Sequence, residues 1–251
     1  FGIFSSLGFL SKYLFIYLLF GILFYFLFNF KKNKKLTKGY FFSIIISLLI
    51  LIPHFYWLIK NNFITIFYGF ARTGLANYNL IDHFINPAFF ILKQIGIMLP
   101  VFIMFFFLLK KIKININFKN KKTVFLFFIN IIPIVLIILT SIFTGAKIRT
   151  MWMTPFYLFF GILLIDLFKK QILLINLKKF YATFLFFLFL SPALYLSISL
   201  LDDNKRTDYP GKEIARLVQN KWDQNFTNEI KIVVGDEWSA GNLSYHLNSR
   251  P

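Results

Sequence analysis

The sequence predicts an all-α polytopic membrane helix bundle, followed by the start of a small α/β domain on the outer side of the membrane. Hydrophobic residues make up 58% of the 251 residues, whereas soluble domains have about 45–50%. They form unbroken runs, such as residues 123–143 and 180–201, which are long enough to cross about 30 Å of hydrocarbon as helices. Because these runs do not alternate between apolar and polar residues, they favour helices over the strands of a barrel.

The apolar runs indicate one cut helix and six complete spans within a membrane domain of residues 1–201. Residues 1–10 are expected to be the outer end of a helix that begins upstream of Phe1, and Ser11-Lys12 forms a short turn. Pro53 is expected to break the second span near its end, because proline lacks a backbone donor. The six spans are residues 13–30, 39–57, 87–109, 123–143, 151–168 and 180–201.

The basic residues of the membrane domain indicate its orientation. Loops 31–38, 110–122 and 169–179 carry 15 lysines and no arginine, whereas the alternate loops 11–12, 60–85 and 144–150 carry five lysines and arginines. Cytoplasmic loops are the ones enriched in Lys and Arg. The sequence therefore predicts a multi-pass protein of the bacterial inner (plasma) membrane, with the second set of loops and the tail on the periplasmic side.

Residues 202–251 form a compositionally different tail, with seven basic and eight acidic residues. A helix is expected to begin near Pro210, with Asp208 as its cap. Four apolar residues of this helix would share one face, namely Ile214, Leu217, Val218 and Trp222. A β-rich run at residues 230–234 and a helix at residues 238–247 would complete the beginning of an α/β domain. We expect this domain to continue beyond Pro251.

Several classes of function are disfavoured by the sequence. The net charge of +18 comes from short loops between apolar spans, so we expect no binding of nucleic acid. Nucleotide-binding, zinc-protease and serine-hydrolase motifs are absent from the sequence. The three histidines are far apart and there is no cysteine, so no metal site is predicted. No cofactor is predicted either, and dependence on a divalent cation is left open.

Cations in the outer loops are the main candidates for a binding site. Lys147 and Arg149 are paired in one short loop, and Lys12 and Arg72 lie in the other two outer loops. Lys93 lies about two turns into the third span. A cation within a membrane helix costs about 2.5–3.5 kcal/mol on insertion scales, which makes it a functional candidate. The alternative is a side chain that snorkels to the interface and binds nothing.

Five segments of the sequence resemble bacterial family-39 glycosyltransferases. These are membrane enzymes of the GT-C fold, related to the protein mannosyltransferases that use dolichyl-phosphate mannose and to the lipid A aminoarabinose transferase. The resemblance depends on the order and spacing of the segments, and it covers nearly the whole chain. The segments are FLSKY at residues 9–13, DHFINP at 82–87 with its continuation to Gln94, GAKIRTMWMTP at 145–155, YPGK at 209–212 and VVGDEWSAGN at 233–242.

The resemblance implies transfer of a hexosyl or pentosyl sugar from a polyprenyl-phosphate carrier to a lipid or glycan acceptor at the outer face. Outer-side cations would then bind the donor phosphate, and these are Lys147, Arg149, Lys12 and Arg72. Asp82, His83 and Trp152 are candidates for the substrate site. The resemblance places the catalytic Asp in the first outer loop of the family, upstream of Phe1, and Asp82 is not interpreted as the catalytic base. Membrane lipids are the other expected partners.

Two alternatives remain open from the sequence. One is a polytopic transporter or flippase of lipid-linked glycans, because Pro100 and Pro133 fall in the middle of spans. Transporters typically also show inverted repeats, and no such repeat is evident. The other is a non-catalytic membrane scaffold for synthesis of the cell envelope.

The orientation can be tested with single cysteines, because the chain has none of its own. In intact cells, an impermeant maleimide is expected to label a cysteine at position 225 and not one at position 115. Labelling at position 115 without labelling at position 225 would invert the predicted orientation.

Overall fold

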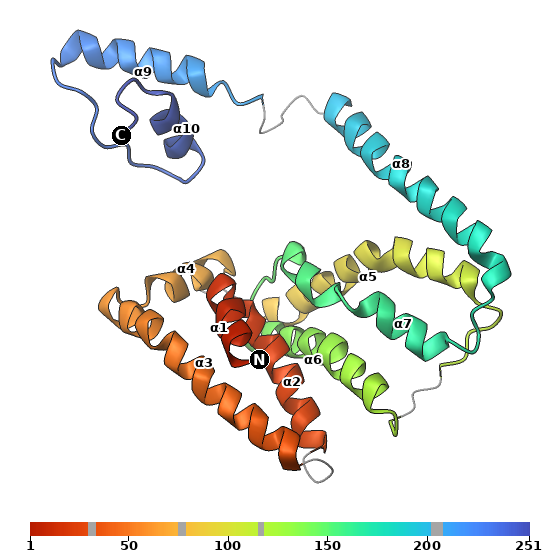
Figure 1. The fold of residues 1–251 in the computed structure, drawn as a ribbon. Coiled ribbons are helices and arrows are strands. Elements are labelled where there is room, and N and C mark those ends of the chain that lie inside the picture. Colours follow the sequence, from red (N-terminus) through yellow and green to blue (C-terminus); the bar gives the residue numbers. More distant parts are fainter. Residues whose placement is uncertain (30–33, 75–78, 115–117, 202–207) are drawn as a thin grey trace. The chain divides into compact units, whose positions relative to one another are not determined.

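A computed structural model describes residues 1–29, 34–74, 79–114, 118–201 and 208–251 of the chain (Figure 1). Parts of the predicted first span, of the first lysine-rich loop and of the tail lie outside the described residues. They include Phe30, Lys31, Lys32 and residues 202–207. The chain divides into two units, residues 1–185 and 186–251.

The first unit consists of helices, as the apolar runs predict. The described residues contain no strand, apart from a single antiparallel bridge between Leu109 and Ile172. The α-helices are α1 (Gly2–Ser11), α2 (Ile16–Asn29), α3 (Lys34–Lys60), α4 (Ile64–Arg72), α5 (Asp82–Leu108), α6 (Lys121–Thr144), α7 (Phe160–Phe168) and α8 (Leu177–Leu201), which continues into the second unit. The 3-10 helices are η1 (Tyr13–Phe15), η4 (Thr150–Tyr157) and η5 (Leu174–Asn176).

Four of the predicted spans are helices long and apolar enough to cross a membrane: Lys38–Lys60, Asp82–Leu108, Lys121–Thr144 and Leu174–Leu201. The fifth, at residues 151–168, is the pair η4 and α7, bent by 54°. The first is described over Tyr13–Asn29, with three 3-10 and fourteen α-helical residues, and its last predicted residue, Phe30, lies outside the described residues. That length spans about 25 Å, less than the hydrocarbon core. Among the described residues, the structure thus shows four candidate spans, or five with the bent pair, whereas the sequence predicts six.

Proline residues act differently in two of these helices. Pro53 lies inside α3, which continues to Lys60, so the predicted break is wrong. A proline removes one backbone donor, and a membrane helix can tolerate this loss when its neighbours compensate locally. Pro155 lies in η4, just before the bend to α7, where the chain leaves regular α-helical geometry.

Loops of the first unit that are predicted to lie on the same side of the membrane are joined to each other by hydrogen bonds. At one end, the peptide N–H of Lys147 donates to the carbonyl oxygen of Thr73 at 2.9 Å, which joins the two longer loops predicted to be outer. At the other end, the N–H of Lys110 donates to the carbonyl of Gln171 at 2.9 Å, which joins two loops predicted to be cytoplasmic. The structure therefore agrees with the pairing of the loops, and which end faces the cytoplasm stays a prediction.

Small residues allow the helices of the first unit to approach closely. Ser6 of α1 is buried and donates to the carbonyl oxygen of Ser47 in α3 at 3.1 Å. Gly21 of α2 lies so close to α6 that a Cβ atom there would be 2.9 Å from the carbonyl oxygen of Phe128. Contacts of this kind hold helices together in lipid, where apolar burial between helices gives little advantage.

Two clusters of larger residues fill the remaining space between α5, α6, η4 and α7. One has Phe90, Ile137, Met153 and Phe156 at its centre. The other has Phe105, Leu108, Leu164 and Phe168. Many other apolar side chains of the spans are exposed, as Ile45 and Leu49 of α3 are at 56% and 60%. Such surface is expected to face lipid rather than water.

The tail contains α9 (Gly211–Asn225) and α10 (Ser239–His246), which pack around Ala215, Ile230 and Leu247. Residues 230–234 form no strand among the described residues, and Ile232 and Val234 are 78% and 91% exposed. The α/β character of the tail is therefore not shown. A β-rich run needs a partner strand for its backbone groups, and the described residues offer none.

Two further details of the tail differ from the prediction. Leu217 is 65% exposed, so it does not share the buried face of α9. The N-cap residue of α9 is Pro210 rather than Asp208. At the start of α10, the Asp236 carboxylate accepts hydrogen bonds from the peptide N–H groups of Trp238 and Ser239. These bonds, the one from Ser239 above all, hold the pKa of Asp236 below its ordinary value.

The close approach of α2 and α6 leads to a stability prediction. In Gly21→Ala the new methyl group would press on the backbone of α6, which cannot give way as a flexible side chain would. Overpacking of this kind typically costs about 1–3 kcal/mol. Thermal or denaturant unfolding in detergent should show the loss.

The matched control is Gly96→Ala in α5, where no atom lies within 4 Å of the added Cβ. This variant should keep the stability of the parent, or gain slightly from better helix propensity. Equal stability of the two variants would show that α2 and α6 do not pack as described.

Candidate anion-binding site

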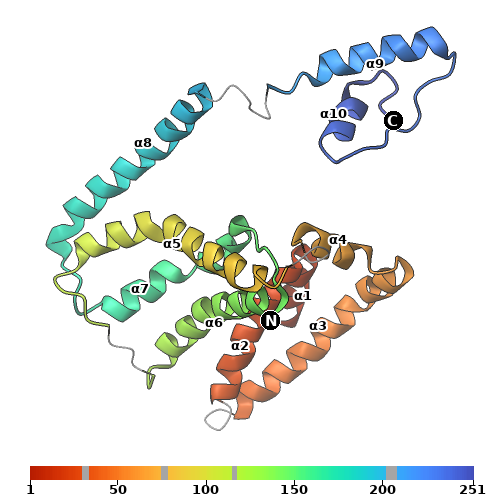
Figure 2. The ribbon, with the colours of Figure 1, turned by 180° about the vertical axis from the view of Figure 1, so that it is seen from behind.

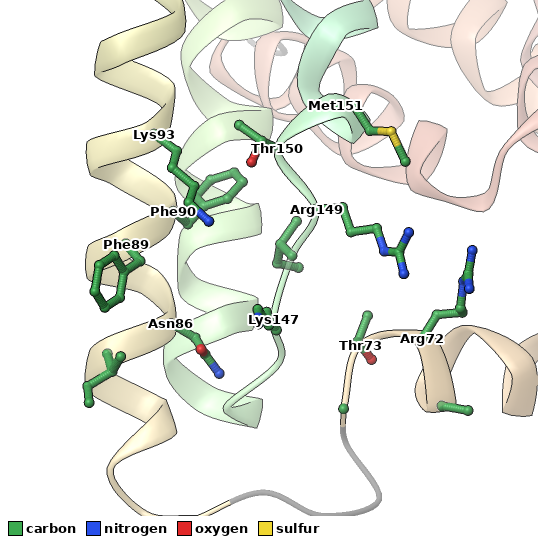
Figure 3. Close-up of a pocket in the computed structure, with 14 residues that line it drawn as sticks. Arg72, Thr73, Asn86, Phe89, Phe90, Lys93, Lys147, Arg149, Thr150 and Met151 are labelled. Atoms are coloured by element: carbon green, nitrogen blue, oxygen red, sulfur yellow. The ribbon is translucent and has the colours of Figure 1, made fainter. Parts of the chain in front are cut away.

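A cavity of about 970 Å³ opens where the loops predicted to be outer meet (Figure 3). Three segments surround it: the end of α4 with the two residues that follow it, the first turns of α5, and the chain between α6 and η4. Its lining residues are Ala71, Arg72, Thr73, Gly74, Ile85, Asn86, Phe89, Phe90, Lys93, Lys147, Ile148, Arg149, Thr150 and Met151.

Four cations line this cavity, and they come from all three segments. Arg72 is the last residue of α4, Lys93 belongs to α5, and Lys147 and Arg149 lie in the chain before η4. Figure 3 shows Arg72 rising from the end of α4 toward Arg149, and Lys93 extending from α5 toward the chain segment that carries Thr150. None of the described lining residues is acidic. An arrangement of like charges around one opening favours an anionic ligand.

Hydrogen bonds from α5 hold the loop that carries Lys147 and Arg149. Helix α6 is capped at its C-terminus by Gly145, whose φ of 70° lies in the left-handed region that glycine adopts easily. The side-chain amide of Asn86 donates to the carbonyl oxygen of Gly145 at 2.7 Å. One turn earlier, His83 Nδ1 donates to the carbonyl oxygen of Ile142 at 2.7 Å. These bonds fix the direction in which the chain leaves α6.

A second set of bonds fixes the other end of the same loop. Gln94 is buried in an otherwise apolar span, and its amide nitrogen donates to the carbonyl oxygen of Thr150 at 3.4 Å. The oxygen of the same amide accepts from the Tyr157 hydroxyl at 2.5 Å. One side chain thus contacts both ends of η4. Because Lys93 precedes Gln94, the backbone of α5 carries a cavity cation and a positioning amide side by side.

The structure brings together three of the four residues predicted to bind the donor phosphate, namely Arg72, Lys147 and Arg149. It adds Lys93, for which the sequence favoured neither function nor snorkelling. Lys12 is not among the described lining residues. The residue after it, Tyr13, makes polar contacts elsewhere: its hydroxyl lies 2.9 Å from His54 Nε2 and 2.8 Å from Thr65 Oγ1.

The three residues proposed for the substrate site do not line the cavity either. The Asp82 carboxylate accepts from the N–H of Asn79 at 2.8 Å and so closes the turn before α5. His83 holds the end of α6, as described above. Trp152 lies in η4, where its peptide N–H donates to the carbonyl oxygen of Arg149 at 3.0 Å. Asp82 and His83 thus hold backbone next to the cavity, Trp152 lies in the helix that follows its cation loop, and a role of these residues toward a substrate stays a prediction.

Within the described ranges, no three His, Asp or Glu side chains gather closely enough to hold a metal ion. Comparisons with models of protein families, with curated proteins and with solved structures gave no match.

Asn86 and Gln94 are the residues whose importance the sequence did not reveal by itself. Both were part of a segment that carried the resemblance, but neither was assigned a role. The available signal was chemical: an amide inside an apolar span needs a partner, because an unsatisfied polar group is costly there. The sequence could not show that these partners were backbone carbonyls of the cation loop.

Removing the Asn86 amide tests whether hydrogen bonds from α5 hold the loop that carries Lys147 and Arg149. Asn86→Ala leaves the Gly145 carbonyl oxygen without its partner, which typically costs about 1–3 kcal/mol. Thermal unfolding should show this loss, and hydrogen exchange should show faster exchange at residues 145–150.

Asn61→Ala is the matched control, because the exposed Asn61 amide donates only to Trp57, within the end of its own helix. It should leave residues 145–150 protected. Equal protection of these residues in both variants would contradict a positioning role for Asn86.

Proposed function

We propose that the chain carries the donor-binding site of a membrane glycosyltransferase. The enzyme would move a hexosyl or pentosyl sugar from a polyprenyl-phosphate carrier to a lipid or glycan acceptor, at the outer face of the bacterial inner membrane. The observation that supports this most is the gathering of Arg72, Lys93, Lys147 and Arg149 around one cavity at one end of an apolar helix bundle. The resemblance of the five sequence segments supplies the reaction class.

The chemistry of the cavity suits a phosphate group attached to a lipid. Arginine can bind two phosphate oxygens at once through its fork, and lysine adds a compact positive charge. A carrier phosphate lies at the surface of the bilayer while its hydrocarbon chain stays among the spans. The volume of about 970 Å³ is at the upper end of ordinary ligand pockets, so it has room for a sugar next to the phosphate.

In the proposed reaction, an acceptor hydroxyl oxygen forms a bond to the anomeric carbon of the sugar. The bond from that carbon to the phosphate oxygen breaks, and its electron pair leaves with the polyprenyl phosphate. A carboxylate base takes the hydroxyl proton. The cavity cations would stabilise the negative charge that grows on the phosphate, and donors aimed at developing charge are a major source of rate enhancement. We assign these four residues to the phosphate and assign the base to none of the residues described.

One structural feature favours a second candidate function, a transporter or flippase of lipid-linked glycans. The pair η4 and α7 is bent by 54° next to the cavity, and transporters commonly place discontinuous helices at their binding sites. Pro100 and Pro133, by contrast, lie inside helices that continue past them. Both candidates require an anionic lipid in the cavity. Sugar transfer to an acceptor in liposomes would identify the first, and movement of intact carrier between leaflets would identify the second.

Binding of the carrier can be measured with the purified chain in nanodiscs and polyprenyl phosphate as the probe. A charge-assisted hydrogen bond is worth about 1.5–3 kcal/mol, which corresponds to a roughly ten- to hundredfold change in affinity. Lys147→Ala combined with Arg149→Ala should weaken binding of polyprenyl phosphate by at least about tenfold. Arg149→Lys keeps the charge and loses the fork, so it should also weaken binding, although less.

Lys12→Ala is the control, because Lys12 is an outer-loop cation that does not line the cavity. It should leave the affinity unchanged. Unchanged affinity in the double variant, or an equal loss in Lys12→Ala, would place the phosphate elsewhere.

A further inference from the structure

Helix α4 follows a sharp turn at the end of α3. Asn62 and Phe63 have φ angles of 50° and 55°, which non-glycine residues rarely adopt. The turn is closed by the N–H of Phe63, which donates to the carbonyl oxygen of Leu58 at 2.9 Å. Figures 1 and 2 show α4 turned away from the axis of α3 beyond this point. The chain therefore leaves a candidate span and does not continue along its direction.

The exposed face of α4 is its apolar face. Ile64, Phe67 and Tyr68 lie at helical spacing on one side and are 59%, 61% and 52% exposed. Thr65, Ile66 and Gly69 lie on the half-buried side, and only Ile66 among them has a large apolar side chain. A helix on a protein surface in water has the opposite arrangement, with its apolar side inward.

The inner face of α4 is held by polar contacts to the bundle. Thr65 Oγ1 shares a hydrogen bond with the hydroxyl of Tyr13 in η1 at 2.8 Å. The same hydroxyl lies 2.9 Å from Nε2 of His54 in α3, and the His54 ring is stacked on Trp57 with centroids 6.0 Å apart. The bond of Thr65 directs this side of α4 toward the bundle. Its aromatic side is thereby directed away from the bundle.

We propose that α4 is an interfacial helix whose outer face binds the phospholipid bilayer at the boundary between head groups and acyl chains. Continuity with the preceding span supports this occupant, because Tyr56 and Ile59 of α3 are 68% and 65% exposed just before the turn. Apolar surface on a candidate span faces lipid, and the exposed side of α4 extends it. Helices of this kind lie with their apolar face about 5–10 Å into the boundary region.

The charges at the ends of α4 also fit a lipid surface. Lys60 is exposed at the end of α3, and Arg72 is the last residue of α4. The guanidinium carbon of Arg72 lies 5.6 Å from the centre of the Tyr68 ring. Cations beside aromatic rings are common at membrane interfaces, where the charge reaches the head groups and the ring stays at the boundary.

The proposal has a consequence for the cavity that does not depend on which reaction the protein performs. Arg72 belongs both to α4 and to the lining of the cavity. A helix bound at the bilayer surface would therefore hold one wall of the cavity at the depth of the lipid head groups. A ligand anchored in the bilayer could reach this wall without leaving it.

Single-cysteine variants of the full chain, labelled with an environment-sensitive fluorophore, test the depth of α4. The probe position is Phe67→Cys. The reference for the acyl core is Leu49→Cys, an exposed mid-span position of α3, and the reference for water is Lys221→Cys, an exposed position of α9. Each variant is placed in vesicles of phosphatidylethanolamine and phosphatidylglycerol. Quenching is measured with aqueous iodide and with lipids that carry a spin label near the head group or deep in the chain.

The label at position 67 should be quenched most strongly by the shallow spin label, with emission between those of the two references. Three other outcomes would overturn the proposal. Quenching by iodide equal to that at position 221 would place the face in water. Strongest quenching by the deep spin label would make α4 a re-entrant helix, and no quenching by any agent would show that protein covers it. Ile64→Cys, on the same face, serves as the probe if Phe67→Cys lowers the unfolding temperature.

Discussion

The hydrogen bond from the Asn86 amide to the carbonyl oxygen of Gly145 is the contact on which the candidate site depends most. In a membrane bundle, backbone groups that leave a helix must find partners within the protein. At the end of α6 this partner comes from α5, and so do those of Ile142 and Thr150. Satisfying three carbonyl oxygens in this way also places Lys147 and Arg149 opposite Lys93. The arrangement of the cations is thus a consequence of how the loop backbone is satisfied.

The two ends of the first unit also differ in charge. At the end opposite the cavity, Asp166 accepts from the Thr123 hydroxyl at 2.5 Å and pairs with Lys169 at 3.1 Å, so a carboxylate offsets part of the local charge. The described lining of the cavity has no acidic residue. A lining that carries four cations and, among its described residues, no acid favours an anionic ligand. This difference is the reason to place a ligand at the cavity end.

Local patterns predicted much of the fold, and contacts between distant segments account for the differences. Length and hydropathy located α3, α5, α6 and α8, because both properties belong to the segment itself. They could not locate the bend between η4 and α7, before which Tyr157 bonds to Gln94 of a distant segment. They also could not show the absence of a strand among the described residues 230–234, where no partner strand is present. Alternation of loop charge singled out Arg72, Lys147 and Arg149. It also included Lys12, because loop position alone cannot show that Tyr13 directs that segment to His54 and Thr65.

The central claim is that a phosphate group binds between the arginines of the cavity. Solid-state NMR can measure dipolar coupling between phosphorus in polyprenyl phosphate and ¹⁵N in the arginine guanidinium groups of the chain in bilayers. The account predicts coupling that corresponds to a hydrogen bond, with nitrogen about 2.7–2.9 Å from a phosphate oxygen. This coupling should disappear when Arg72 and Arg149 are both replaced by lysine. Absence of coupling in the parent chain, or its persistence in that double variant, would contradict the claim.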